Sequence, residues 1–124
     1  MPREWTRLCK GAGFAVDGDE IEVRFANERH HRVRVDDEGD AFRVVGVVAR
    51  RAAVEGIKNV ALQAWRRNRS TQLVGFRLDE RGRLVGESWV PKAGLSSEEF
   101  ATYVRRVAAE CDRLEYLLTG RDTE

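Results

Sequence analysis

The sequence predicts an α+β fold in which an antiparallel sheet of about five strands is covered by a long C-terminal helix. Two kinds of apolar spacing support this prediction. Alternating apolar and polar residues recur at short intervals in the first half of the chain, and spacings of three and four follow in two later segments. No strand–helix–strand repeat typical of a parallel sheet is present. At 124 residues, the chain fits a single domain spanning residues 1–124.

The first half is expected to form one short helix and three strands. Residues 3–10 place Trp5, Leu8 and Cys9 on one helical face. Strands are predicted at three ranges and joined by short polar turns, which is the pattern of an antiparallel meander. These ranges are 20–25, 31–35 and 41–49. The third strand is a nearly continuous β-branched run, as expected of a central strand covered on both faces.

The second half adds a helix, a hairpin and the long final helix. Residues 54–65 repeat apolar side chains at three and four, which predicts a helix. Residues 73–78 and 83–90 alternate about a turn that contains Gly82, so they are expected to pair as strands. The expected element order is therefore α-β-β-β-α-β-β-α.

The final helix has the best-defined start. Ser96 and Glu99 form a capping box, in which each residue satisfies a backbone N–H of the other. One apolar stripe then runs along the helix to a stop at Gly120. Its members are Phe100, Val104, Val107, Cys111, Leu114 and Leu118. A stripe of this length is typical of a helix that lies on a sheet.

Composition excludes several classes of protein. The chain has no apolar run of the ~20 residues that a membrane helix needs. It also shows no signal peptide, and its two cysteines are too few for a disulfide framework, so we expect a cytoplasmic protein. Lys and Arg total 22 against 21 Asp and Glu, a net charge of +1. That balance lacks the basic excess common in nucleic-acid-binding proteins.

No catalytic motif is present, so we expect neither an enzyme nor a cofactor. The sequence contains no phosphate-binding loop, no nucleophile elbow and no zinc-binding HExxH pair. His30 and His31 would point to opposite faces of a strand and could not share one metal ion. We expect these histidines to lie at a solvated hairpin tip and expect no metal site.

The second half resembles a known family in several places. Residues 64–120 carry Trp65 and Asn68, a strand at 74–79, a turn and strand at 82–91, and a helix that opens at 94–100 and contains Cys111. These features resemble the YbjN-like family, whose fold is similar to the CesT-type chaperones of type III secretion. The resemblance implies a small cytoplasmic homodimer that binds a segment of another protein. It also implies a dimer contact on the middle helix.

Together these observations predict a non-enzymatic, chaperone-like or regulatory protein-binding module. We expect Trp65 and Trp89 at the interface, because Trp is enriched among residues that dominate binding energy. Arg66 and Arg69 are the basic residues expected beside them. The alternative is a nucleic-acid-binding regulatory protein that uses its arginine clusters, with the tryptophans as stacking surfaces. Core packing of either tryptophan remains open at this point.

Overall fold

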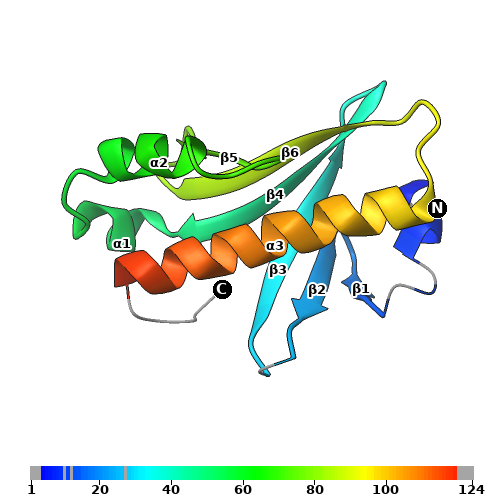
Figure 1. Ribbon diagram of the computed structural model, residues 1–124, viewed down its shortest axis with the longest axis horizontal. Coiled ribbons are helices and arrows are strands. Elements are labelled where there is room, and N and C mark those ends of the chain that lie inside the picture. The colour runs from blue at the N-terminus through cyan, green and yellow to red at the C-terminus, as the bar shows by residue number, and fades with distance from the viewer. Residues whose placement is uncertain (1–3, 10, 12, 27, 120–124) are drawn as a thin grey trace.

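The structure is a computed structural model that describes residues 4–9, 11, 13–26 and 28–119. Its six strands form one antiparallel sheet, and the helix α3 (Ser97–Thr119) runs across one face, which confirms the predicted fold class (Figure 1). The remaining elements are η1 (Glu4–Cys9), β1 (Ala15–Asp17), β2 (Glu20–Arg24), β3 (His30–Asp37), β4 (Ala41–Ala49), α1 (Arg51–Glu55), α2 (Val60–Asn68), β5 (Gly75–Leu78) and β6 (Leu84–Pro91).

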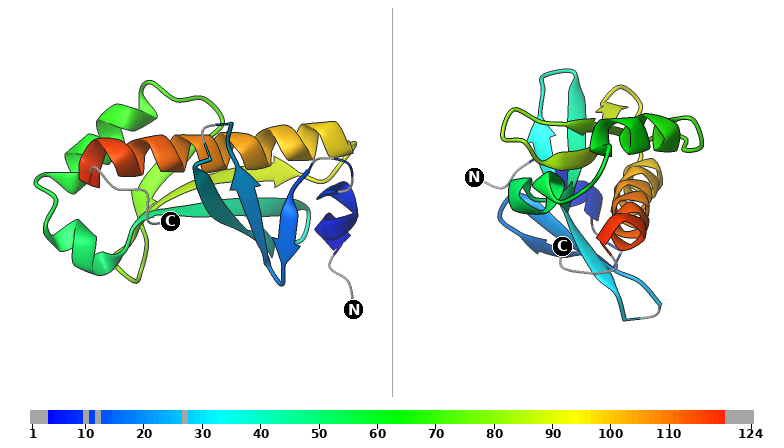
Figure 2. Two further views of the ribbon diagram at one scale, coloured as in Figure 1. Left: turned by 90° about the horizontal axis from the view of Figure 1, so that it is seen from below. Right: turned by 90° about the vertical axis from the view of Figure 1, so that its left-hand side faces the viewer.

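The strands lie in the order β1-β2-β3-β4-β6-β5. β4 is central, as expected, and it pairs with β3 on one side and β6 on the other. The chain leaves the sheet after β4, forms α1 and α2 at one end, and returns as the edge strand β5 (Figures 1 and 2). β6 then lies between β5 and β4. The helices α1 and α2 lie beside the C-terminal end of α3.

The main core lies between the sheet and α3. All six apolar residues predicted for the helix stripe face this core, and five of them are buried while Leu118 is partly buried. The capping box forms as predicted: the Glu99 backbone N–H donates to Ser96 Oγ over 3.1 Å, and the Ser96 N–H donates to the Glu99 carboxylate over 3.4 Å. The apolar spacing and the cap therefore fix both the buried face and the start of α3.

Two glycines allow α3 to approach the sheet closely. Gly46 and Gly86 are directly opposite each other on β4 and β6, and the thiol of Cys111 lies against them. A Cβ added at Gly46 would lie 2.9 Å from Cys111 Sγ, and one at Gly86 would lie 2.6 Å from it. The paired glycines therefore form a shallow slot in the sheet that receives the Cys111 side chain.

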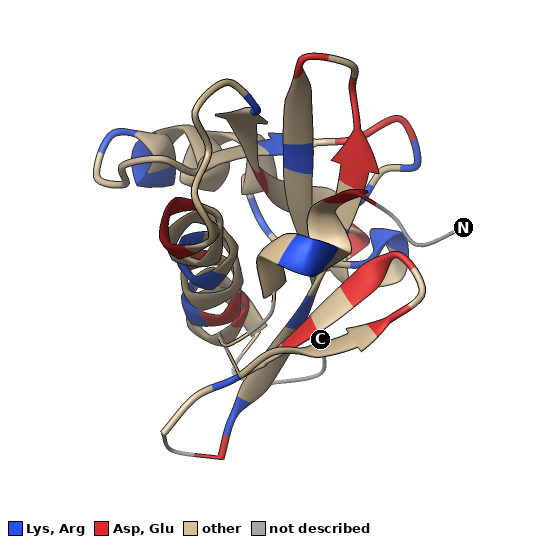
Figure 3. Cartoon of the chain, turned by 90° about the vertical axis from the view of Figure 1, so that its right-hand side faces the viewer, with Lys and Arg blue, Asp and Glu red and all other residues tan. Residues whose placement is uncertain are grey.

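No helix among the described residues lies on the opposite face of the sheet. This face is covered instead by paired charges: Arg43 contacts both Asp36 and Glu87, and Arg77 donates to Glu87 over 2.8 Å. The long side chains of Arg34 and Glu87 flank Val45 on the neighbouring strands and help to keep it buried. Figure 3 shows acidic segments at the hairpin turns and strand ends, with basic segments on neighbouring parts of the chain.

The structure differs from the prediction in three elements. β1 is a sixth strand, and the expected helix at 54–65 is two helices separated by residues 56–59. Asn59, with φ of 55°, lies in the left-handed region just before α2, so the chain cannot continue as one helix. The first helix is a 3₁₀ turn, and the predicted positions Arg3, Lys10 and Gly120 lie outside the described residues.

Candidate protein-binding surface

A groove opens between α2 and the end of α3. It has a volume of about 500 Å³ and is lined by Leu62 and by three leucines of α3, Leu114, Leu117 and Leu118. Leu62 and Leu117 are 42% and 61% exposed to solvent. The ion pair between Arg67 and Glu110, 3.1 Å long, joins the two helices across the groove.

The rim of this groove is basic, and an aromatic side chain lies beside it on α2. Lys58, Arg66 and Arg67 line it, and Trp65 follows Leu62 by one turn on the same side of α2. Trp65 is 55% exposed, and the guanidinium of Arg69 stacks 5.2 Å from its ring centre. α2 as a whole buries only Ala64 among its residues. A helix with large apolar side chains in water is typical of a surface that another protein covers.

Trp89 lies on the other side of the sheet. Gly86 faces α3, so alternation along β6 directs Trp89 to the opposite face, where it lies across from Arg43. The Arg43 guanidinium is 5.9 Å from the Trp89 ring centre, and the ring is 53% exposed. Trp65, Arg66 and Arg69 therefore share one surface, and Trp89 belongs to a second one. Neither tryptophan is a core residue, whereas Trp5 is.

The two edges of the sheet differ in their capacity to accept another strand. On β5, the Asn68 side chain accepts a hydrogen bond from the Phe76 N–H over 2.7 Å and donates one to the Phe76 carbonyl over 3.0 Å. Asn68 thus occupies the position that an added strand would use. β1, at the other edge, is three exposed residues long. The groove is consequently a better contact surface than either edge.

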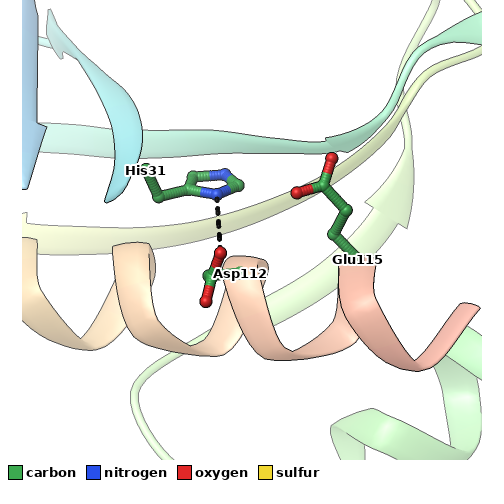
Figure 4. A group of neighbouring side chains, drawn as sticks. All are labelled: His31, Asp112 and Glu115. Atoms are coloured by element: carbon green, nitrogen blue, oxygen red, sulfur yellow. Dashed lines mark ion pairs between the residues drawn. The ribbon is translucent and has the colours of Figure 1, made fainter. Parts of the chain in front are cut away.

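A buried polar cluster lies beneath α3, and the sequence did not reveal it. His31 of β3 and Asp112 and Glu115 of α3 are each at least 94% buried. Figure 4 shows the three side chains converging between the strand and the helix, with His31 Nδ1 3.9 Å from Asp112 Oδ1. Arg29 pairs with the other oxygen of Asp112 over 2.9 Å and stacks 4.9 Å from the ring centre of Tyr116.

The prediction of a solvated hairpin tip is wrong for His31 and correct for His30, which is exposed. The physical reason is strand alternation: His31 occupies the same face as Val33 and Val35, so it points into the core. That signal was present in the sequence. The presence of Asp112 and Glu115 opposite it was not, because the packing of α3 on β3 depends on the tertiary fold.

The two thiols are poor candidates for chemistry. Burial raises the pKa of Cys9 to about 11. Burial also raises the pKa of Cys111, which contacts the carbonyl oxygens of Gly46 and Gly86. Because the thiolate is the reactive form, both cysteines are held in the unreactive thiol state at neutral pH.

A comparison with protein families identifies the chain's relatives. The sequence model of the family YbjN, described as "Putative bacterial sensory transduction regulator", matches residues 7–116. The chain belongs to the YbjN family. No curated protein matches this YbjN chain.

Solved structures share its fold at low sequence identity. A chain of the ExoU–SpcU complex from the type III secretion system of Pseudomonas aeruginosa has a TM-score of 0.60 and 16% identity, over 85% of this YbjN chain and 87% of that one. A chain of the ExsC–ExsE complex has a TM-score of 0.57 and 16% identity, over 84% and 80% of the two chains. A chain of the HopA1–SchA chaperone–effector complex has a TM-score of 0.50 and 14% identity, over 84% and 81%.

The family match confirms the resemblance drawn from the sequence, and these structures confirm its expected fold. At these identities the likeness concerns the fold alone. Among the described residues of this YbjN chain, no helix has both the length and the apolar character needed to cross a membrane.

Proposed function

We propose that this YbjN chain is a non-enzymatic module that binds another protein through the groove between α2 and α3. The observation that carries the proposal is the pair of exposed leucines that line one opening, Leu62 and Leu117, with the exposed Trp65 one turn further along α2. Related folds occur in complexes of a chaperone with its effector, which supports the same class of function.

The chemistry of the groove indicates the kind of segment it would accept. Its leucine floor favours a segment with apolar anchors, and its rim of Lys58, Arg66 and Arg67 favours acidic flanking residues. An amphipathic segment of a partner protein, apolar on one side and acidic at its borders, meets both requirements.

The outer face of the sheet gives less support to a nucleic-acid-binding function. Its arginines are engaged by carboxylates: Arg34 pairs with Asp36, Arg43 with Asp36 and Glu87, and Arg77 with Glu87. A phosphate backbone would have to displace these internal partners.

Site-specific photo-crosslinking tests the proposal directly. In one variant a photoreactive amino acid replaces Leu62 in the groove. In the matched control the same photoreactive amino acid replaces Trp89 on the opposite face of the sheet. Irradiation in the native cell is expected to yield a discrete protein adduct from position 62, resistant to nuclease and to high salt. An adduct that disappears with nuclease or salt would refute the proposal in favour of nucleic acid, since phosphate contacts weaken steeply with salt. Equal amounts of protein adduct from positions 62 and 89 would refute the location of the binding surface in the groove.

We also propose that the free protein is a homodimer, with α1 and α2 of each copy at the contact. This part rests on the resemblance alone, which implies a dimer contact on the middle helix. Sedimentation equilibrium of the wild type is expected to give twice the chain mass of 14.1 kDa. A monomer over the whole concentration range would overturn the dimer and leave the groove proposal standing.

A further inference from the structure

We propose that His31, Asp112 and Glu115 form a binding site for a divalent transition-metal ion beneath α3. The three residues each offer one ligand atom, and these atoms lie within 4.8 Å of one another. One imidazole nitrogen and two carboxylate oxygens form a donor set that suits Zn²⁺, Mn²⁺ or Fe²⁺. The site is separate from the groove and does not depend on the proposed function.

The geometry requires only small side-chain movements. In a tetrahedral site with bonds of about 2.0–2.1 Å, neighbouring ligand atoms are roughly 3.3 Å apart. His31 Nδ1 and Asp112 Oδ1 are already 3.9 Å apart. Asp112 and Glu115 are three residues apart on one helix and therefore share a face. Figure 4 shows both carboxyl groups directed toward the imidazole from that helix.

The hydrogen bonds around the cluster orient the ligands as metal sites require. His31 Nε2 donates to the Val47 carbonyl oxygen over 2.9 Å, because a carbonyl oxygen can only accept. In the neutral imidazole, Nδ1 then carries the lone pair, and Nδ1 is the nitrogen that faces Asp112. Arg29 holds Asp112 Oδ2 over 2.9 Å and so directs Oδ1 toward the imidazole. Groups that hydrogen-bond to the ligand side chains without contacting the metal ion are a general feature of metal sites.

The charge of the cluster also favours a cation. Asp112 is 6% exposed and Glu115 is 1% exposed. Two carboxylates at this depth are costly to bury without positive charge nearby. Arg29 supplies one such charge beside Asp112. A divalent ion held by all three side chains would place positive charge beside both carboxylates while Arg29 remains in place.

One member of the cluster, Glu115, lines a cavity that opens to the surface. This cavity of about 460 Å³ lies between α1 and the end of α3, and Glu115 lines it together with Ala49, Ile57 and Leu118. Arg50 also lines this cavity. An ion could enter through this cavity, and three protein ligands would leave at least one coordination position open toward it.

The test uses the full chain after dialysis against chelator, with Zn²⁺ as the titrant and Co²⁺ as the spectroscopic probe. Calorimetry is expected to give one Zn²⁺ per chain. Asp112→Asn and Glu115→Gln are each expected to weaken binding by about tenfold or more, since losing even an outer-shell partner costs 10- to 100-fold. Glu110→Gln is the matched control, because Glu110 lies on α3 outside the cluster and pairs with Arg67. It should bind Zn²⁺ like the wild type.

A second measurement keeps the proposal testable if the cluster variants fail to fold. The chain has only two histidines, so its imidazole NMR signals are few, and the variant His30→Gln assigns them. Zn²⁺ is expected to shift the His31 signals and leave those of the exposed His30 unchanged. Perturbation of His30 alone, or a thiolate-to-cobalt charge-transfer band from a cysteine, would overturn the site. Absence of Zn²⁺ binding to the folded wild type would overturn it as well.

Discussion

Replacing Gly46 with alanine tests how closely α3 packs on the sheet. The added Cβ would lie 2.9 Å from Cys111 Sγ and 3.3 Å from its Cβ, whereas carbon atoms in good contact are about 3.5–4.0 Å apart. Overpacking of this kind costs about 1–3 kcal/mol. For a chain of this length, each 1 kcal/mol lowers Tm by about 3–5 °C. We therefore expect Gly46→Ala to be clearly destabilised in urea denaturation.

The double variant shows whether the cause is the sulfur atom. Cys111→Ala alone is expected to cost about 1 kcal/mol through lost burial. In that background Sγ is gone and the Cβ contact of 3.3 Å is the closest that remains, so most of the Gly46→Ala penalty should disappear. The two substitutions should therefore show a favourable coupling of about 1–2 kcal/mol. Strictly additive free energies of unfolding would refute the close packing described here.

Three further predictions concern the cap, the sheet edge and an exposed ion pair. Ser96→Ala should cost about 1 kcal/mol in thermal unfolding, whereas Ser97→Ala, one residue inside the helix, should cost less; equal losses would contradict the capping box. Asn68→Ala should speed amide hydrogen exchange at Phe76, because Asn68 covers that N–H; unchanged exchange would contradict this role. The Lys92 ammonium, 2.8 Å from Asp37, together with the Gly39 N–H, lowers the pKa of Asp37 below its usual value. The stabilisation that this ionised Asp37 gives is present above its unfolded-state pKa and is lost as pH falls through the lowered pKa of the folded state. The difference in free energy of unfolding between the wild type and Asp37→Asn should therefore disappear in acid and persist at neutral pH.

Much of the fold could be predicted because its signals are local. Alternation in the strands, the stripe of α3 and the capping box at Ser96 depend on residues near one another in sequence. The break between α1 and α2 could not be placed from spacing, since a kink at residues 56–59 preserves apolar positions three and four apart. β1 is a three-residue edge strand without a buried side chain, so it leaves no apolar pattern to detect.

The candidate site was predictable only in part. Trp65 and Trp89 were expected at one interface, and nothing in their spacing indicates that α2 lies on the α3 side of the sheet while Trp89 faces the other side. That separation follows from the pairing of β6 with β4 and from the docking of α2 beside α3, both of which are tertiary. Leu117 became a candidate only because the end of α3 reaches the groove.

The affinity of Trp65→Ala for the partner captured at position 62 tests the central claim most directly. Trp buries about 150–250 Å² when covered, and Trp65 is 55% exposed, so a partner could cover roughly 100 Å² more. At about 25 cal/mol per Å² this corresponds to ~2.5 kcal/mol, or a loss of affinity of about 50- to 100-fold. Trp89→Ala, equally exposed on the opposite face, is expected to bind like the wild type. A folded Trp65→Ala with unchanged affinity, or a larger loss for Trp89→Ala, would contradict a protein-binding surface between α2 and α3.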